Sequence, residues 1–296
     1  MKILLTGKTG QLGFELRRSL APLAEVVALD SHACDLSDPD AIRRWVREVR
    51  PAVIVNAAAY TAVDKAESEP QRAYAINAEA PGILAEEAAR LGALIVHYST
   101  DYVFDGSKEQ GAYSETDAPH PVSVYGSSKL AGEQAVAAAN QRHLILRTSW
   151  VVGVHGQNFA KTMLRLAAEK EQLNIVADQW GAPTSAALLA DITGHLLREH
   201  QRCASGDFPY GLYHLTASGE TNWHQYASHV IEHARAAGKP MRVAANAVQP
   251  IATSNYPTPA RRPLNSRLST HKLQQAFGLR LPEWQEGVNH ILEQLI

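Results

Sequence analysis

Short apolar runs alternate with longer amphipathic stretches along the first half of the chain. The runs are three or four residues long and contain no polar position, whereas the stretches between them carry apolar residues at helical spacing. The pattern predicts strands at 3–5, 26–29, 53–55, 94–96 and 144–146, and helices at 11–20, 41–49, 71–91 and 124–139. Alternation of strand and helix is typical of a parallel sheet, and strands that are apolar throughout indicate a sheet covered on both faces. The pattern therefore predicts a doubly wound α/β fold.

The alternation of predicted strands and helices ends at about residue 150. Helical patterns over 158–170 and 188–198 and a short apolar run at 212–215 are followed by a region that is broken by proline-rich turns. We expect the run at 212–215 to return to the sheet, and the remaining segments to form a smaller α/β lobe at the carboxyl ends of the strands.

Composition and charge exclude several classes of protein. The 296 residues include 28 Lys and Arg against 30 Asp and Glu, a formal net charge of −2. A nucleic-acid-binding protein is expected to show a basic excess or stripe, so that class is disfavoured. The two cysteines, Cys34 and Cys203, are far apart, which favours a reducing compartment such as the cytoplasm. No run of eighteen apolar residues and no secretory pattern is present, so we expect no membrane association.

Three glycines follow the first predicted strand at the start of a helix. Gly7, Gly10 and Gly13 form the pattern Gly-x-x-Gly-x-x-Gly. The first allows a tight turn, the second a close approach of backbone to a pyrophosphate, and the third close packing of helix on strand. The phosphates then lie at the helix N-terminus, where N–H groups and the dipole favour anions. The position of the motif predicts a Rossmann-type dinucleotide site, in preference to a glycine-rich turn without a ligand.

The second predicted strand ends in a carboxylate. Asp30 follows Gly13 by 17 residues, where an acidic side chain accepts hydrogen bonds from an adenosine ribose. It would repel a 2′-phosphate and so favours NADH, whereas Lys8 and His32 can offset that repulsion for NADPH. The sequence leaves the choice between the two cofactors open, and a plain turn residue is the alternative for Asp30.

A tyrosine and a lysine lie four residues apart in a predicted helix. Tyr125 and Lys129 share one helix face. A nearby ammonium favours the phenolate, so we expect a lowered tyrosine pKa and a proton donor that works near neutral pH. Thr100, in the segment 99–101 after the strand at 94–96, can hold a carbonyl oxygen beside that phenol. A surface Tyr–Lys pair and a capped turn are the alternatives without function.

These motifs together resemble the extended short-chain dehydrogenase/reductase family, and within it the dTDP-4-dehydrorhamnose reductases. The resemblance extends over nearly the whole chain. Its segments are GKTGQLG (7–13), VNAAAYTAVDKAESEP (55–70), STDYVF (99–104), VYGSSKLAGE (124–133), RTSWV (147–151), NFAKTML (158–164), DQWGAPT (178–184), GLYHL (211–215) and YPTPARRPLNSRL (256–268). The family implies a Rossmann domain over 1–150 and about 186–215, with a sugar-nucleotide lobe over 151–185 and 216–296.

The resemblance also implies an activity and residue roles. The expected reaction is hydride transfer from NADPH or NADH to the C4 carbonyl of dTDP-4-dehydro-β-L-rhamnose, giving dTDP-L-rhamnose for cell-surface polysaccharide. Tyr125 is the implied proton donor, Lys129 its partner and ligand of the nicotinamide ribose, and Thr100 orients the carbonyl. Asp101 and Trp150 are the implied substrate-binding residues besides Thr100. From its own chemistry, Arg262 in the Arg-Arg-Pro turn at 261–263 is expected to bind the diphosphate of the substrate, with a solvated basic turn as the alternative. The expected cofactor-binding residues are Gly7, Gly10, Gln11, Leu12, Gly13, Asp30, Asp35, Leu36, Ala59, Tyr60, Thr61, Tyr98, Tyr125 and Lys129.

One residue separates this chain from the related dehydratases. Those enzymes follow the Thr-Asp pair with a glutamate that acts on the C5 proton, whereas this chain has Tyr102. A tyrosine has no carboxylate to abstract that proton, so the departure favours reduction over dehydration.

A metal site is weakly indicated. Related reductases form dimers around Mg²⁺ held by glutamates, and Glu15 matches one of them. The position near Ala187 has no carboxylate, and Gln294 aligns with the last ligand. The sequence therefore leaves a homodimer and weak Mg²⁺ binding as open predictions. His229 and His233 lie one helical turn apart without a third ligand, so a solvated helix face is the better interpretation.

Two other functions remain as alternatives. The chain can act on a different sugar nucleotide, as a reductase or an epimerase, because the sequence does not resolve the substrate pocket. It can also serve as a regulatory subunit of a methionine adenosyltransferase that binds NADP without turnover. The presence of Tyr125, Lys129 and Thr100 together with Trp150 favours catalysis.

Overall fold

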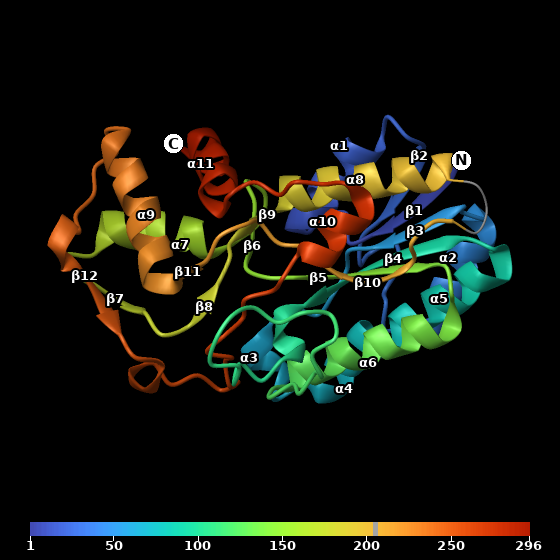
Figure 1. Ribbon diagram of the computed structural model, residues 1–296, viewed down its shortest axis with the longest axis horizontal. Helices are drawn as coiled ribbons and strands as arrows, with labels where there is room; N and C mark the ends of the chain where they lie inside the picture. Colours follow the sequence, from blue (N-terminus) through green and yellow to red (C-terminus); the bar gives the residue numbers. More distant parts are fainter. Residues whose placement is uncertain (204–206) are drawn as a thin grey trace.

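A six-stranded parallel sheet forms the centre of the molecule in the computed structural model, which describes residues 1–203 and 207–296 (Figure 1). Its strands are β1 (Lys2–Thr6), β2 (Glu25–Leu29), β3 (Val53–Asn56), β4 (Leu94–Thr100), β5 (His143–Thr148) and β10 (Gly211–His214). They lie in the order β2-β1-β3-β4-β5-β10, and every pair is parallel. The predicted doubly wound α/β fold is confirmed, including the return of the chain to the sheet after residue 210.

Helices cover both faces of the sheet. Helices α1 (Gln11–Leu20) and α8 (Ala186–Arg202) lie on one face, and α2 (Pro39–Val49), α5 (Ala80–Leu91) and α6 (Val124–Ala139) lie on the other (Figure 1). The strand residues alternate between the two cores: Leu5 packs with α1 and α8, whereas Leu4 packs with α2 and α5. Both neighbours are almost fully buried, which explains why the strands are apolar at successive positions.

The strand order reverses direction between β1 and β3. From β1 the chain moves outward to β2, and it then crosses back to β3 and continues toward β10 on the other side. In open α/β sheets a crevice forms outside the carboxyl ends of the strands at such a switch point. The loops that follow β1 and β3 therefore border the expected ligand site.

The predicted helix over 71–91 is present, but it is π-helical instead of α-helical in its middle. The structure has α3 (Val63–Ala66) and α4 (Pro70–Tyr74), then a π-helical turn η1 (Ala75–Glu79), and only then α5. Asn77 of that turn is buried. Its side-chain amide accepts from the backbone N–H of Tyr60 and donates to the carbonyl oxygen of Tyr60 and to the hydroxyl of Ser128. Such π turns interrupt α-helices at places where tertiary contacts demand it, so hydrophobic periodicity does not reveal them.

A separate apolar core lies beside the sheet. It unites α7 (Phe159–Glu169), α9 (Trp223–Ala236), α11 (Trp284–Leu295) and the parallel pair β7 (Leu173–Val176) and β12 (Val248–Ile251). The remaining short elements are η2 (Asp101–Val103), β6 (Val151–Val152), β8 (Trp180–Gly181), β9 (Thr184–Ser185), β11 (Thr221–Asn222), η3 (Ala245–Ala247), η4 (Thr253–Asn255) and α10 (His271–Phe277). Leu273 of α10 packs with the core of the sheet instead. No described helix is long and apolar enough to cross a membrane.

Candidate functional site

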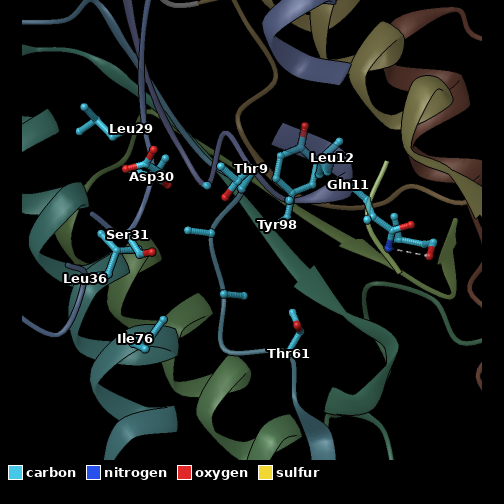
Figure 2. A pocket seen from close by; sticks show the side chains of 18 of the residues that line it. Thr9, Gln11, Leu12, Leu29, Asp30, Ser31, Leu36, Thr61, Ile76 and Tyr98 are labelled. Carbon is cyan, nitrogen blue, oxygen red and sulfur yellow. Dashed lines mark hydrogen bonds between the residues drawn. The ribbon is translucent and has the colours of Figure 1, made fainter. Parts of the chain in front are cut away.

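A cavity of about 690 Å³ lies at the carboxyl ends of the central strands. It extends from Asp30 and Leu36 at the end of β2, past the glycine loop, to Tyr98 of β4 (Figure 2). Twelve of the fourteen predicted cofactor-binding residues line it: Gly7, Gly10, Gln11, Leu12, Asp30, Asp35, Leu36, Ala59, Thr61, Tyr98, Tyr125 and Lys129. Gly13 and Tyr60 do not line it. The Tyr60 hydroxyl instead donates to Glu69 at 2.8 Å.

The glycine loop is shaped for close contact between backbone segments. Gly7 has a φ of 78°, and a Cβ there would lie 2.8 Å from the backbone nitrogen of Ala58. A Cβ on Gly13 would lie 2.0 Å from the carbonyl oxygen of Gly7, so Gly13 serves helix packing. Helix α1 begins at Gln11 with no side-chain cap and no acidic residue in its first turn. Its first N–H groups and its dipole are therefore available to a phosphate.

Asp30 is engaged by a cation of the glycine loop. Its Oδ2 lies 2.9 Å from Lys8 Nζ, and its Oδ1 accepts from the backbone N–H groups of His32 (3.1 Å) and Ala33 (2.9 Å). The hydrogen bond from Lys8 is the largest cause that lowers the pKa of this carboxyl to about 2, so it is ionised at any physiological pH. The ammonium next to it reduces the repulsion that Asp30 alone would exert on a 2′-phosphate.

Helix α6 brings the predicted Tyr–Lys pair to the cavity. Ser123 caps the helix by accepting from Gly126 N at 3.1 Å, and Lys129 lies about one turn after Gly126. Lys129 is 2% exposed, and its Nζ donates to the carbonyl oxygen of Tyr98 at 2.6 Å. Burial lowers the pKa of Lys129 to about 8, which brings its titration close to neutral pH.

The pKa of Tyr125 departs from the expectation. Burial raises the pKa of Tyr125 to about 12. The hydrogen bond with Thr100 acts against burial, and the charge of Asp101 acts with it. The expected lowering of the Tyr125 pKa by Lys129 is therefore absent, because Lys129 Nζ is directed to the carbonyl oxygen of Tyr98 and the burial of the phenol dominates. Tyr125 is thus a protonated phenol, which suits a proton donor.

The turn after β4 lies behind Tyr125. Thr100 and Asp101 are both buried, and the Thr100 hydroxyl donates to Asp101 Oδ1 at 2.9 Å. Burial raises the pKa of Asp101 to about 6. The ring of Tyr102 meets the Tyr125 ring edge-on with 5.6 Å between centroids. Neither Thr100 nor Asp101 lines the large cavity.

Trp150 and Arg262, the other predicted substrate residues, also lie outside the lining of the large cavity. Trp150 has a φ of 46°, which is rare for an aromatic residue, and its ring stacks on Trp223 with 3.7 Å between centroids. A Cβ on Gly181 would lie 2.8 Å from the Trp150 ring. Arg262 donates to Asp64 Oδ2 at 2.8 Å, and its guanidinium lies 6.0 Å from the centroid of the Tyr102 ring.

Several buried polar atoms near these residues lack a hydrogen-bond partner among the described residues. Two of them, Ser99 Oγ and Thr148 Oγ1, belong to residues that line the cavity, and two more, Asp101 Oδ2 and Arg262 Nη1, belong to predicted substrate residues outside that lining. Buried polar groups are ordinarily paired, so atoms of this kind at a cavity fit a polar ligand. Together with the glycine loop, they form a site that suits a dinucleotide cofactor.

Sequence reasoning missed part of the site. The cavity is also lined by Thr6, Thr9, Leu29, Ser31, Cys34, Arg72, Ile76, Gly156 and Gln157, for which no role was predicted. Arg72 and Ile76 come from α4 and the π turn, whose course depends on tertiary contacts. Buried His97, which contacts Lys129, carried a usable signal, since it is a polar residue inside an apolar strand.

The residues around Glu15 do not fit a metal ion within one chain. Glu15 pairs with Arg18 at 3.2 Å, and Arg18 also reaches Asp191 at 3.0 Å. Across residues 1–203 and 207–296, no group of three or more His, Cys, Asp or Glu side chains is placed to hold a metal. Mg²⁺ requires several oxygen ligands, and here the carboxylate is taken by a guanidinium.

Comparisons with known proteins agree with this geometry. A family model described as the RmlD substrate binding domain matches residues 1–296. The chain is 53% identical over 299 residues to the dTDP-4-dehydrorhamnose reductase of Escherichia coli (strain K12), covering 100% of this chain and 98% of that protein. A crystal structure of the Clostridium acetobutylicum reductase has a TM-score of 0.90 at 38% identity, covering 100% of this chain and 99% of that chain.

A second solved structure bears on the cofactor. The dTDP-4-dehydrorhamnose reductase of Bacillus anthracis, solved in complex with NADP, has a TM-score of 0.90 at 35% identity, with 99% of each chain covered. The matched family model and these relatives span the glycine loop, the Tyr–Lys pair and the second core alike. The chain therefore belongs to the dTDP-4-dehydrorhamnose reductase family.

Proposed function

We propose that this chain reduces the C4 keto group of dTDP-4-dehydro-β-L-rhamnose with NADPH or NADH, giving dTDP-L-rhamnose for cell-surface polysaccharide. The observation that carries the proposal is the position of Tyr125 and Lys129 on one wall of a cavity whose other end is formed by the glycine loop and Asp30. Relatives named dTDP-4-dehydrorhamnose reductase, 50–53% identical over the whole chain, support this choice of substrate.

The cavity supports a nicotinamide dinucleotide. The N-terminus of α1 at Gln11 would hold the pyrophosphate, and Asp30 with Lys8 would contact the adenosine ribose or its 2′-phosphate. When bound, the cofactor supplies the hydride. Asp30 can accept hydrogen bonds from the ribose hydroxyls of NADH, and the adjacent Lys8 ammonium can pair with the 2′-phosphate of NADPH. We therefore propose that the enzyme accepts both cofactors.

The proton comes from the protein. Tyr125 is protonated at neutral pH and would donate its hydrogen to the C4 oxygen as charge develops there. Lys129 borders the cavity and would stabilise the resulting phenolate and bind the nicotinamide ribose. Thr100 and Asp101 would orient the carbonyl. By the resemblance to the dehydratases, position 102 would hold the base for C5 proton abstraction, and Tyr102 offers no carboxylate there.

The nucleotide sugar needs a second set of contacts. We propose that residues 1–150 with 186–215 bind the dinucleotide and that residues 151–185 and 216–296 hold the dTDP-sugar. The unpartnered Nη1 of Arg262 would reach the diphosphate, and Trp150 would border the sugar. We place the enzyme in the cytoplasm. A homodimer and weak Mg²⁺ binding agree with the proposal, and no step of it is routed through either.

The deciding experiment is an oxidation assay. The purified chain is mixed with enzymatically prepared dTDP-4-dehydro-L-rhamnose and either NADPH or NADH, with and without EDTA. We expect consumption of both cofactors, dTDP-L-rhamnose as product, and no loss of rate with EDTA. Measurable cofactor binding without consumption would overturn the proposal in favour of another sugar nucleotide or of a regulatory subunit.

A further inference from the structure

A row of buried polar side chains crosses three adjacent strands and ends at Lys129. Thr6 of β1, Asn56 of β3 and His97 of β4 are register partners across the sheet and point to the same face. Thr6 Oγ1 lies 2.6 Å from Asn56 Oδ1, Asn56 Nδ2 lies 3.1 Å from His97 Nδ1, and His97 Nε2 lies 3.3 Å from Lys129 Nζ. All four side chains are between 0% and 2% exposed.

Buried polar side chains destabilise a fold unless each of them has a hydrogen-bond partner. The contact between His97 and Lys129 decides which atoms of the row donate and which accept. In the arrangement shown, Asn56 Nδ2 donates to His97 Nδ1. A neutral His97 then carries its hydrogen on Nε2, facing Lys129 Nζ. An N–H can face the lone pair of an amine but not an ammonium, which has only donors. This arrangement therefore belongs to the uncharged form of Lys129.

The row has a second arrangement that suits the ammonium. If the Asn56 amide turns over, Oδ1 accepts from His97 Nδ1–H, and His97 Nε2 is left to accept from Lys129. The Thr6 hydroxyl satisfies both arrangements, because it can donate to Oδ1 or accept from Nδ2. A valine or alanine at position 6 could do neither.

We propose that His97 is a positioning residue for Lys129, which holds Nζ in place in both charge states by exchanging which ring nitrogen carries its hydrogen. The carbonyl oxygen of Tyr98 takes a second N–H of Lys129, so one N–H of the ammonium is left to face the cavity. The net change on titration is the release of one proton from the Lys129–His97 pair, and His97 keeps one ring hydrogen throughout. The role in turnover rests on the proposed function.

Few charges act on the pair. Burial and the Lys129 ammonium keep the pKa of His97 well below its usual value, so the ring stays neutral. Burial brings the pKa of Lys129 to about 8, with Glu133 of α6 acting against burial. Arg147 of β5 engages Glu133 through two contacts of 2.8 and 2.6 Å.

Tyr125 of α6 and Asp101 of η2 are the other titratable groups of the site, and neither shifts the pKa of Lys129, which responds to burial and Glu133. Tyr125 is a neutral phenol, whose pKa Asp101 raises. The members contributed by β1 and β3, Thr6 and Asn56, are neutral. Lys129 is therefore the group whose titration the His97 tautomer should follow.

The first test needs no substrate. Long-range ¹H–¹⁵N spectra of ¹⁵N-histidine-labelled protein report which ring nitrogen carries the hydrogen, and the His97→Gln variant identifies the His97 signals among those of 13 histidines. We expect the hydrogen on Nδ1 at about pH 6 and on Nε2 at about pH 10, with the change centred near the pKa of Lys129. In Lys129→Met the change should vanish. One tautomer at both pH values, or a change that persists in Lys129→Met, would overturn the proposal.

The second test compares two substitutions. Leucine at position 97 can neither donate nor accept, whereas the amide of glutamine can present either group to Nζ. We expect His97→Leu to lower kcat about tenfold or more, and His97→Gln to restore kcat to within about threefold of the unsubstituted chain. Equal loss in both variants, with matching thermal melting, would contradict a positioning role.

The two proposals fail separately. If the unsubstituted chain does not turn over the dTDP-sugar, the proposed function fails, while the tautomer spectra still decide the role of His97. If turnover is found but the tautomer is independent of pH, the function stands and the role of His97 is withdrawn.

Discussion

At the scale of single residues, Tyr125 holds the proton that reduction requires. Its pKa near 12 means that the free site is fully protonated, and the phenolate forms only as the carbonyl oxygen gains charge. Removing the hydroxyl with Tyr125→Phe should lower kcat by about 10²- to 10⁴-fold. The NADPH dissociation constant, measured by cofactor fluorescence, should change less than about threefold. Retained activity in this variant would rule out Tyr125 as the donor.

Asp30 and Lys8 predict how the two cofactors are discriminated. Asp30→Ala removes an acceptor for the ribose hydroxyls and leaves the Lys8 ammonium without its partner at 2.9 Å. NADH binding should weaken by about tenfold, whereas NADPH binding should change little, because Lys8 becomes available to the 2′-phosphate. Titrations with both cofactors measure the ratio. An equal loss for both would remove Asp30 from the ribose site.

Asp101 predicts a dependence of stability on pH. Its pKa is raised from 3.8 to about 6 by burial, so the folded chain holds a proton that the unfolded chain releases. The contribution is present below about pH 4 and is lost as the pH rises through about 6, a difference of about 3 kcal/mol in the free energy of unfolding. Asp101→Asn should therefore gain stability relative to the unsubstituted chain between pH 4 and 7, as followed by chemical denaturation. A difference that does not vary with pH would refute this origin.

Single residues were predictable where a motif fixes their surroundings. The glycine loop apart from Gly13, Asp30 and the Tyr125–Lys129 pair line the cavity, because each follows a strand or starts a helix at a known spacing. The pKa of Tyr125 was not predictable, since its sign depends on burial and on where Lys129 points. The pairing of Arg262 with Asp64, 198 residues away, has no local signal at all.

At the scale of elements, the close approach of α6 to η2 aligns the proton donor with the turn behind it. A Cβ on Gly126 would lie 2.2 Å from the carbonyl oxygen of Tyr102. Gly126→Ala should force the turn of Thr100 and Asp101 away from Tyr125. We expect kcat to fall by about tenfold or more, since small displacements of positioned groups are expensive. Cofactor affinity should stay near that of the unsubstituted chain.

The neighbouring Ser127→Ala is the matched control, because it alters the same helical turn without entering that contact. Both variants are assayed for turnover and for NADPH binding. Equal activity of the two variants would show that the turn tolerates the displacement. A loss of cofactor binding in Gly126→Ala would point instead to a wider disruption of α6.

Elements follow from the sequence where they bury a continuous apolar face. The strands and the helices α1, α2 and α6 lie within a few residues of their predicted ranges. The π turn at 75–79 was missed because its cause is tertiary: Asn77 is fixed by Tyr60 and Ser128, and its carbonyl approaches Gly132 so closely that a Cβ would lie 2.0 Å away. Helical periodicity contains none of these contacts.

At the scale of the whole molecule, the apolar core beside the sheet is separate from the two cores that cover its faces. The core around α7, α9 and α11 is distinct from the cores that pack on the two faces of the sheet, and no residue of α9 or α11 lines the large cavity. Damage to the second core should therefore affect the nucleotide sugar more than the dinucleotide. Leu292 of α11, which is fully buried, offers the means to separate the two effects.

Leu292→Ala should lower the free energy of unfolding by about 2–5 kcal/mol, through lost burial and the cavity that remains. At a temperature where the variant is still folded, the NADPH dissociation constant should stay within about twofold, while KM for the dTDP-sugar rises. Leu84→Ala in the core beneath α5 is the matched control, since it removes the same buried atoms on the side of the cofactor. It should weaken NADPH binding at a similar loss of stability. If both variants affect the two ligands equally, the cores act as one unit, and the assignment of a separate sugar lobe is wrong.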